Sequence, residues 1–190
     1  VDNPQKIVYG RQRGWRLSDR GRQEAEAVAR HLDGRPIARV YTSPLERAVQ
    51  TATVIAGACG GEVEPRDDLV EAWLCAPWEG MPWRDVRRGR AQEWARYLFR
   101  PLEICDVAED LRALAARMDT ALRAIAAAHS AQQVVVVSHG DPLKAGILSL
   151  TGGDLSELHR SAFPTGGLAS VEVDGAGPAR ILERWVPGRE

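Results

Sequence analysis

Four consecutive valines at residues 134–137 restrict the fold of this chain more than any other feature. Valine is β-branched and favours extended backbone, and a strand that is apolar on both faces is typical of the middle of a parallel sheet. The run ends at the tetrapeptide Ser-His-Gly-Asp (residues 138–141), and an apolar helical pattern follows from Pro142. Ligands of open α/β sheets bind beyond the carboxyl ends of the strands. His139 is therefore a candidate for chemistry, although a hydrogen-bonded histidine at a strand–helix turn fits the segment equally well.

The rest of the chain alternates helical patterns with short strands, and this alternation predicts an α/β domain. We expect a three-layer α/β/α arrangement around a mostly parallel central sheet. Ser18 is predicted to cap the first helix, and Ser43-Pro44 to begin the second. The expected helices cover about residues 19–32, 44–59, 107–129 and 142–150; the expected strands lie within 37–41, 62–70 and 134–137, with a closing hairpin over 168–173 and 179–185.

Residues 72–101 break this pattern, because they are irregular and rich in aromatic side chains. We interpret them as a small helical lid insertion within a single domain that spans residues 1–190. The insertion carries several arginines that would suit a flat or anionic leaving group, although a solvated helix face is the commoner reason for such a pattern. These arginines are Arg84, Arg87, Arg88, Arg90 and Arg96.

The composition excludes several classes of partner. A formal net charge of -1 gives no electrostatic reason to expect nucleic acid or an acidic membrane as partner. No apolar run approaches the length that spans a bilayer. The 3 cysteines are odd in number and have no close pairing, so they indicate neither a disulfide framework nor a metal knuckle. We expect a cytoplasmic protein without a metal or another cofactor.

Two further residues are candidates for chemistry because of where they stand relative to the expected strands and helices. Arg47 falls in the first turn of the helix that follows Ser43-Pro44, where the free N–H groups and the helix dipole favour anions. Glu71 lies between apolar neighbours, so its pKa could be raised enough for general acid catalysis. Taken singly, a solvated arginine and an exposed carboxylate at a strand end are the commoner explanations.

Together, the segments around these residues resemble the signatures of the histidine phosphatase superfamily, the phosphoglycerate mutase-like proteins. Tyr-Thr-Ser-Pro-Leu-Glu-Arg-Ala-Val-Gln-Thr-Ala (residues 41–52) is similar to the second signature, and Ser-His-Gly (138–140) to the second-histidine segment. Leu-Val-Glu (69–71) followed by Trp-Glu-Gly (78–80) resembles the acidic motif, and residues 17–25 resemble the first helix. Each motif is weak alone, but all of them occur in the family's order and spacing.

The sequence departs from the family pattern in two places. The Arg-His-Gly motif, whose histidine becomes phosphorylated in the family, is absent, and the resemblance implies that it would lie just upstream of Val1 on a central strand. An incomplete amino end and an inactive relative are the two explanations, and the intact motifs elsewhere favour the first. The spacing from Glu71 to Trp78 is also one residue longer than the common form, which leaves Glu79 as a less favoured alternative acid.

The resemblance implies a metal-independent phosphatase that hydrolyses a small phosphomonoester through a phosphohistidine. Arg47 and His139 would hold the phosphoryl group, and Glu71 would protonate the leaving oxygen. Asn3 and Arg11 would reach the phosphate or the rest of the substrate from the first loop.

Two alternatives to this phosphatase remain. One is a mutase that transfers the phosphoryl group to a sugar acid, which the short insertion disfavours. The other is a non-catalytic phosphate-binding or scaffold protein, if Val1 is the true start. The expected partner is a small phosphorylated substrate, and a homodimer is an assembly that the sequence leaves open.

Overall fold

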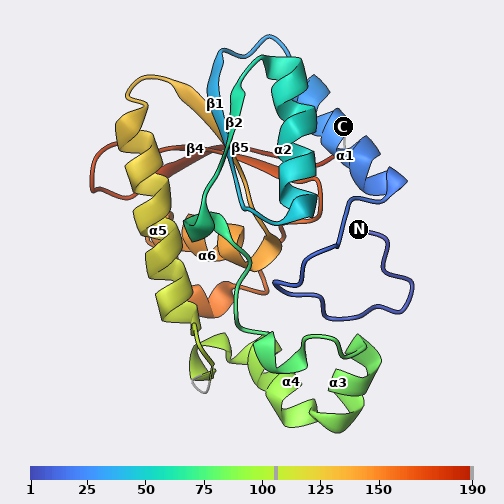
Figure 1. Ribbon diagram of the computed structural model, residues 1–190. Helices are drawn as coiled ribbons and strands as arrows, with labels where there is room; N and C mark the ends of the chain where they lie inside the picture. The colour runs from blue at the N-terminus through green and yellow to red at the C-terminus, as the bar shows by residue number, and fades with distance from the viewer. Residues whose placement is uncertain (105–106, 189–190) are drawn as a thin grey trace.

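The computed structural model describes residues 1–104 and 107–188. Its elements alternate in the order that the sequence predicts, with short 3-10 turns between them (Figure 1). The helices are α1 (Asp19–His31), α2 (Glu46–Cys59), α3 (Trp83–Gly89), α4 (Ala91–Phe99), α5 (Leu111–Ala128) and α6 (Gly140–Thr151). The strands are β1 (Ile37–Thr42), β2 (Glu62–Pro65), β3 (Gln133–Val137), β4 (Leu168–Glu172) and β5 (Arg180–Trp185).

Three strands form a parallel sheet in the order β2-β1-β3, and β4 pairs with β5 in a separate antiparallel hairpin. The register of β1 with β3 places Thr42 opposite Val137, so both strands end at the same edge of the sheet. The predicted strand at the valine run, the parallel sheet and the closing hairpin are therefore confirmed.

Helices cover both faces of the parallel sheet, which is the α/β arrangement predicted (Figure 1). Val134 and Val136 pack into a cluster with the buried side chains of α5, whereas Val135 and Val137 pack into a second cluster with those of α1 and α2. Successive side chains of a strand point to opposite faces, so the valine run supplies apolar contacts to both layers. This explains why the run is apolar at every position.

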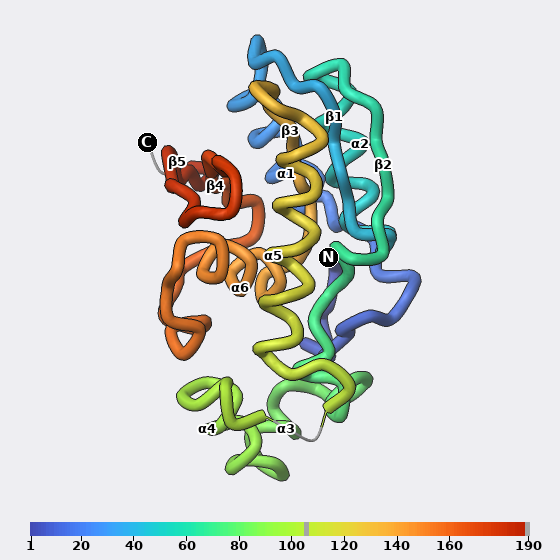
Figure 2. Tube along the Cα trace, turned by 90° about the vertical axis from the view of Figure 1, so that its left-hand side faces the viewer, coloured from blue at the N-terminus to red at the C-terminus, as the bar shows by residue number. Residues whose placement is uncertain are grey.

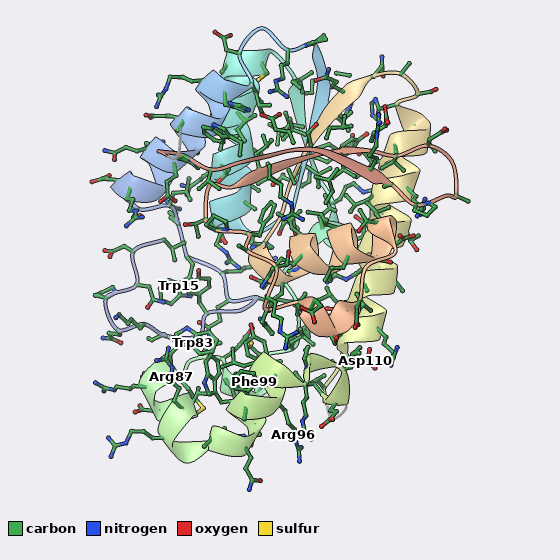
Figure 3. All side chains as sticks on the ribbon, turned by 180° about the vertical axis from the view of Figure 1, so that it is seen from behind. Trp15, Trp83, Arg87, Arg96, Phe99 and Asp110 are labelled. Atoms are coloured by element: carbon green, nitrogen blue, oxygen red, sulfur yellow. The ribbon has the colours of Figure 1, made fainter. Side chains whose placement is uncertain are left out.

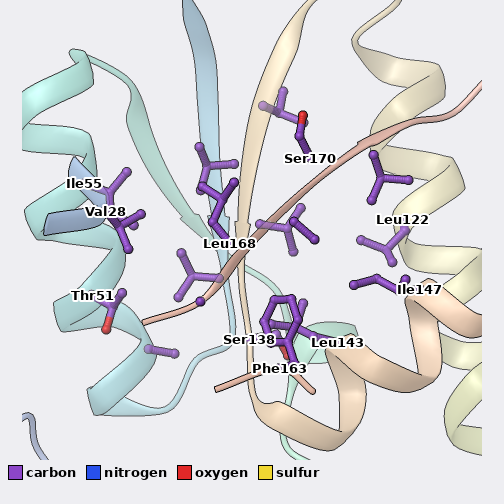
Figure 4. Close-up of a pocket in the computed structure, with 18 of the residues that line it drawn as sticks. Val28, Thr51, Ile55, Leu122, Ser138, Leu143, Ile147, Phe163, Leu168 and Ser170 are labelled. Carbon is purple, nitrogen blue, oxygen red and sulfur yellow. The ribbon is translucent and has the colours of Figure 1, made fainter. Parts of the chain in front are cut away.

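In the part of the chain that the structure describes, β3 lies at an edge of the parallel sheet and its valines are only half-buried, which differs from the buried middle strand that the valine run predicts. A cavity of about 1850 Å³ extends along the edge of β3 that faces away from β1. The cavity is lined by β3 on one side and by β4 on the other. The hairpin of β4 and β5 lies on the side of β3 that is opposite to β1 (Figure 2). The side chains in this gap include apolar ones, such as the labelled Leu122, Ile147 and Leu168, together with polar ones, such as Ser138 and Ser170 (Figure 4).

Three of the four predicted helix starts differ from the observed ones by a few residues. Ser18 caps α1 as expected, with its hydroxyl accepting a hydrogen bond from the Gly21 N–H group. The second helix begins at Glu46 rather than at Pro44, because Leu45 still has an extended backbone and is the cap residue. The third predicted helix begins at Leu111 rather than at about residue 107, and the Asp110 carboxylate caps its first turn. The fourth begins at Gly140, two residues before the predicted start.

Residues 72–101 form a helical segment beside the carboxyl edge of the sheet, with α3 and α4 at its centre (Figure 1). Its aromatic side chains Trp78 and Tyr97 are buried in one cluster with the inner face of α5. The labelled Trp83, Arg87, Arg96 and Phe99 all belong to this segment (Figure 3). The arginines predicted to lie on it are at least partly exposed, and Arg87 also stacks over the Trp94 ring at 5.4 Å.

The first loop pairs with this segment rather than with the sheet. The Val8 N–H group donates to the Met81 carbonyl (2.8 Å), and the Gly80 N–H group donates back to Val8 (2.9 Å). A single antiparallel bridge joins Ile7 to Pro82. Within the described residues, no helix combines the length and the apolar character needed to cross a membrane.

Candidate active site

His139 and Ser43 meet at the carboxyl edge of the sheet because β1 and β3 end side by side there. His139 is the residue before α6, and Ser43 follows the last residue of β1. The Nε2 atom of His139 lies 2.7 Å from the Ser43 hydroxyl oxygen, and both side chains are buried. The Ser43 hydroxyl oxygen also accepts a hydrogen bond from the Leu45 N–H group (3.4 Å), and Leu45 is the cap residue of α2, without a side-chain hydrogen bond.

Glu71 approaches the same histidine from a segment without regular secondary structure. Its Oε2 atom lies 3.6 Å from Nδ1 of His139 and 3.8 Å from Nη2 of Arg47. Its Oε1 atom accepts a hydrogen bond from the Ala72 N–H group at 2.9 Å. The three residues that the sequence marked for chemistry, Arg47, Glu71 and His139, are therefore brought together.

Arg47 is buried in the first turn of α2, and not all of its guanidinium nitrogens have hydrogen-bond partners among the described residues. Its Nη2 atom donates to the Gly10 carbonyl at 2.7 Å, and its guanidinium carbon lies 4.9 Å from the centre of the Tyr9 ring. Its Nη1 atom is buried and has no hydrogen-bond partner among the described residues. Buried donors are nearly always paired in folded proteins, so an unpaired guanidinium nitrogen points to an anionic ligand.

Of the two candidates in the first loop, Arg11 contacts the segment that carries Glu71, whereas Asn3 bonds its own loop. Arg11 reaches the site: its Nε atom donates to the Glu71 carbonyl (2.6 Å), and its Nη2 atom pairs with Glu109 (2.9 Å). Both ends of the Asn3 amide bond the backbone of Ile7, at 2.8 and 2.9 Å, so Asn3 shapes its own loop. Glu79, the alternative acid, accepts from the Arg11 backbone N–H group at 2.6 Å and forms no ion pair with Arg47 or His139.

Burial shifts the proton affinities of the carboxyl group and the imidazole in opposite directions. Burial, followed by the negative charge of Asp141, raises the pKa of Glu71 to about 7. Burial, followed by the charges of Arg47 and Arg11, lowers the pKa of His139 well below its usual value. Near neutral pH the site therefore combines a neutral imidazole, a fixed cation and a carboxyl group that exchanges its proton readily.

Sequence reasoning missed several residues of the site. Asp141 raises the pKa of Glu71, and it also accepts a hydrogen bond from Tyr97 (2.7 Å) and pairs with Lys144 (2.8 Å). Glu109 and Arg117 hold the segment that carries Glu71, as described below. The position of Asp141 directly after the Ser-His-Gly motif was a usable signal, whereas nothing in the local sequence marks Glu109 or Arg117.

No group of three or more histidine, cysteine, aspartate or glutamate side chains suited to a metal ion occurs in the part of the chain that the structure describes. The positive charge at the site comes from arginine instead. A buried arginine, a neutral imidazole and a proton-exchanging carboxyl group at the carboxyl edge of a parallel sheet are typical of α/β enzymes that act on anionic substrates.

Comparison with known proteins defines the family. A model described as histidine phosphatase superfamily (branch 1) matches residues 1–185. Phosphoserine phosphatase 1 of Hydrogenobacter thermophilus is 32% identical over 143 residues, covering 75% of this chain and 67% of that protein. The uncharacterized protein Rv0525 of Mycobacterium tuberculosis is 38% identical over 184 residues, covering 92% and 86%. The structure of Bacillus stearothermophilus YhfR matches with a TM-score of 0.84 and 22% identity, covering 96% and 89% of the two chains. The chain therefore belongs to the histidine phosphatase superfamily.

Proposed function

We propose that the protein hydrolyses a small phosphomonoester, with Arg47 and His139 holding the phosphoryl group and Glu71 acting as the general acid. The convergence of these three side chains from α2, the end of β3 and the 69–72 segment carries the proposal, since one Glu71 oxygen lies within 4 Å of both partners. The unpaired Nη1 atom of Arg47 supplies a donor for a phosphoryl oxygen. Similarity to a phosphoserine phosphatase supports a phosphomonoester as the substrate.

The reaction proceeds in two steps. In the first, a nucleophilic histidine forms a bond to phosphorus while the ester P–O bond breaks, and Glu71 gives its proton to the leaving oxygen. In the second, Glu71 takes a proton from water as that water attacks phosphorus, the N–P bond breaks and inorganic phosphate leaves. Arg47 and the neutral His139 stabilise the equatorial oxygens in both steps, and no metal ion is needed because protein groups supply the charge.

The nucleophilic histidine is proposed to come from a strand that precedes Val1. The cavity between β3 and β4 supports this placement, because its lining includes the edge of β3, which has no strand partner on that side among the described residues, together with Val1 itself. It also includes His139, Arg47 and Glu71. A strand in this gap would bury the half-exposed valines and would end beside the three site residues.

Residues 72–101 are proposed to act as a lid. They lie beside the carboxyl edge of the sheet, and their Trp73 ring stacks against the Arg11 guanidinium at 4.7 Å. The two described cysteines, Cys59 and Cys75, are free thiols, which suits the cytoplasm proposed from the sequence.

The test uses the full-length protein with a chelator present. We expect phosphate release from p-nitrophenyl phosphate and from O-phosphoserine, and a labelled intermediate that is acid-labile and alkali-stable, as a phosphohistidine is. Absence of hydrolysis with both esters contradicts the proposal and favours the scaffold alternative. Phosphoryl transfer that requires a bisphosphoglycerate primer and releases no phosphate identifies a mutase instead.

A further inference from the structure

The segment that carries Glu71 is held in place by side chains from other parts of the chain. Residues 70–73 belong to no helix or strand, so their backbone groups need partners from elsewhere. Each carbonyl from residue 68 to residue 71, and the N–H group of residue 73, bonds a side chain. The bonds are Arg117 Nη1 to Asp68 (2.7 Å) and Val70 (3.1 Å), Ser138 Oγ to Leu69 (2.7 Å), Arg11 Nε to Glu71 (2.6 Å), and Trp73 N–H to Glu109 Oε2 (3.3 Å).

Glu109 is the centre of this arrangement. Its Oε1 atom accepts from Arg117 Nε at 2.6 Å, and its Oε2 atom accepts from Arg117 Nη2 at 3.0 Å and from Arg11 Nη2 at 2.9 Å. The side chains of Glu109, Arg117 and Arg11 are 12%, 19% and 21% exposed, so solvent can replace few of these bonds. One carboxylate therefore fixes two guanidinium groups, and both of them bind the backbone at or beside Glu71.

We propose that Glu109 and Arg117 are positioning residues that hold Glu71 in line with the leaving oxygen of the substrate; this inference rests on the proposed function. Neither side chain forms a hydrogen bond to Glu71's carboxyl group, and they act through the backbone of residues 68–73. Proton transfer to the leaving oxygen requires a heavy-atom distance of about 2.6–3.2 Å. A displacement of about 1 Å can cost about 100-fold in rate, so loosening this segment selectively weakens acid catalysis.

The substitutions Glu109→Gln and Arg117→Lys test the proposal. Glutamine keeps the shape of the side chain but replaces one acceptor oxygen with a donor, which faces the guanidinium donors of Arg117 and Arg11. Lysine keeps the charge of Arg117 but has a single nitrogen, so it cannot bond Glu109 twice and two carbonyls as well.

The readout is the ratio of kcat/KM for O-phosphoserine to kcat/KM for p-nitrophenyl phosphate in the full-length protein. The alkyl leaving group needs a proton and the nitrophenolate does not, so loss of acid positioning lowers the first value more than the second. We expect the ratio to fall about 10- to 100-fold in both variants. Because both substrates are measured on the same preparation, the ratio does not depend on the fraction of the variant that is folded.

Asp119→Asn is the matched control, because Asp119 also holds an arginine of α5. Its carboxylate accepts from Arg123 Nε at 2.9 Å, both side chains are 25% exposed, and Arg123 Nη1 bonds the carbonyls of Gly175 (2.8 Å) and Gly177 (3.1 Å). We expect its ratio to equal that of the wild type. An unchanged ratio in both Glu109→Gln and Arg117→Lys, or an equal fall in the control, overturns the positioning role alone. A wild-type protein that hydrolyses neither ester overturns the proposed function instead.

Discussion

The Nδ1 atom of His139 lies 3.6 Å from Oε2 of Glu71, while Nε2 on the other side of the ring lies 2.7 Å from the Ser43 hydroxyl. The imidazole is thus held between groups from two distant segments of the chain. Burial disfavours the charged form of both the imidazole and the carboxyl group, which lowers the pKa of His139 and raises that of Glu71. The exchangeable proton near neutral pH therefore belongs to the carboxyl group, as general acid catalysis requires.

Replacing Glu71 with glutamine is expected to slow the hydrolysis of O-phosphoserine by about 10²- to 10⁴-fold, the usual contribution of a general acid. The rate with p-nitrophenyl phosphate should fall much less in the phosphorylation step, because its leaving group needs no proton. Burst-phase kinetics on the full-length protein separate this step from hydrolysis of the intermediate. Glu79→Gln serves as the comparison, and a larger loss in Glu79→Gln than in Glu71→Gln would assign the acid to Glu79.

The raised pKa of Glu71 also predicts how stability depends on pH. Between the ordinary value of 4.5 and about 7, the folded protein holds a proton on Glu71 that the unfolded chain releases, so this residue makes the free energy of unfolding decrease as pH rises through that window. Glu71→Gln removes the effect. We expect the variant to gain stability relative to the wild type on going from about pH 5 to about pH 8, measured by urea unfolding.

His139 contributes a slope of the opposite sign, because its lowered pKa costs stability as pH falls below the ordinary value of 6.5. His139 is present in both the wild type and Glu71→Gln, so its contribution cancels when the free energies of unfolding of the two proteins are subtracted. A stability difference that does not change with pH would contradict the raised pKa of Glu71.

Arg47→Lys is expected to lower kcat by about 10²- to 10³-fold, the typical loss when one oxyanion donor is removed. Lysine keeps the positive charge but cannot bond the Gly10 carbonyl and also present a second nitrogen to the phosphoryl group. Arg39→Lys is the control, since Arg39 pairs with Glu62 and Glu64 at the β1–β2 side of the sheet. If the activity of Arg47→Lys is close to that of Arg39→Lys, Arg47 does not bind the phosphoryl group.

Gly146→Ala tests the packing of α6 against α5. A Cβ atom at Gly146 would lie 2.9 Å from Leu122 Cδ1 and 3.1 Å from Met118 Cβ, so the two helices would have to separate. We expect a loss of about 1–3 kcal/mol in the free energy of unfolding, as in other overpacked cores. Gly89→Ala, at the end of α3, meets no atom within 4 Å and should leave stability unchanged or slightly higher. Equal stability of the two variants would mean that α5 and α6 can move apart to accommodate the added methyl group without a loss in the free energy of unfolding.

Local patterns predicted most of the secondary structure. The start of α1 and the closing hairpin follow from capping and alternation, which depend on neighbouring residues. The start of α2 was placed two residues too early, and the contact of the Ser43 hydroxyl with His139, 96 residues further along the chain, was not predicted. The valine run showed that both faces of its strand are apolar, but the partner on each edge depends on which segments pack beside it.

The sequence by itself determined the α/β fold and the family, and it predicted Arg47, Glu71 and His139 as residues of the site. These follow from side-chain periodicity and from motifs that are each continuous in the chain. Only the tertiary structure decided what surrounds Glu71: the link between Arg11 and Glu109 spans 98 residues, and the raised pKa of Glu71 comes from burial and from Asp141. Such contacts arise when packed elements exclude water around groups that are distant in the chain, so no local pattern encodes them.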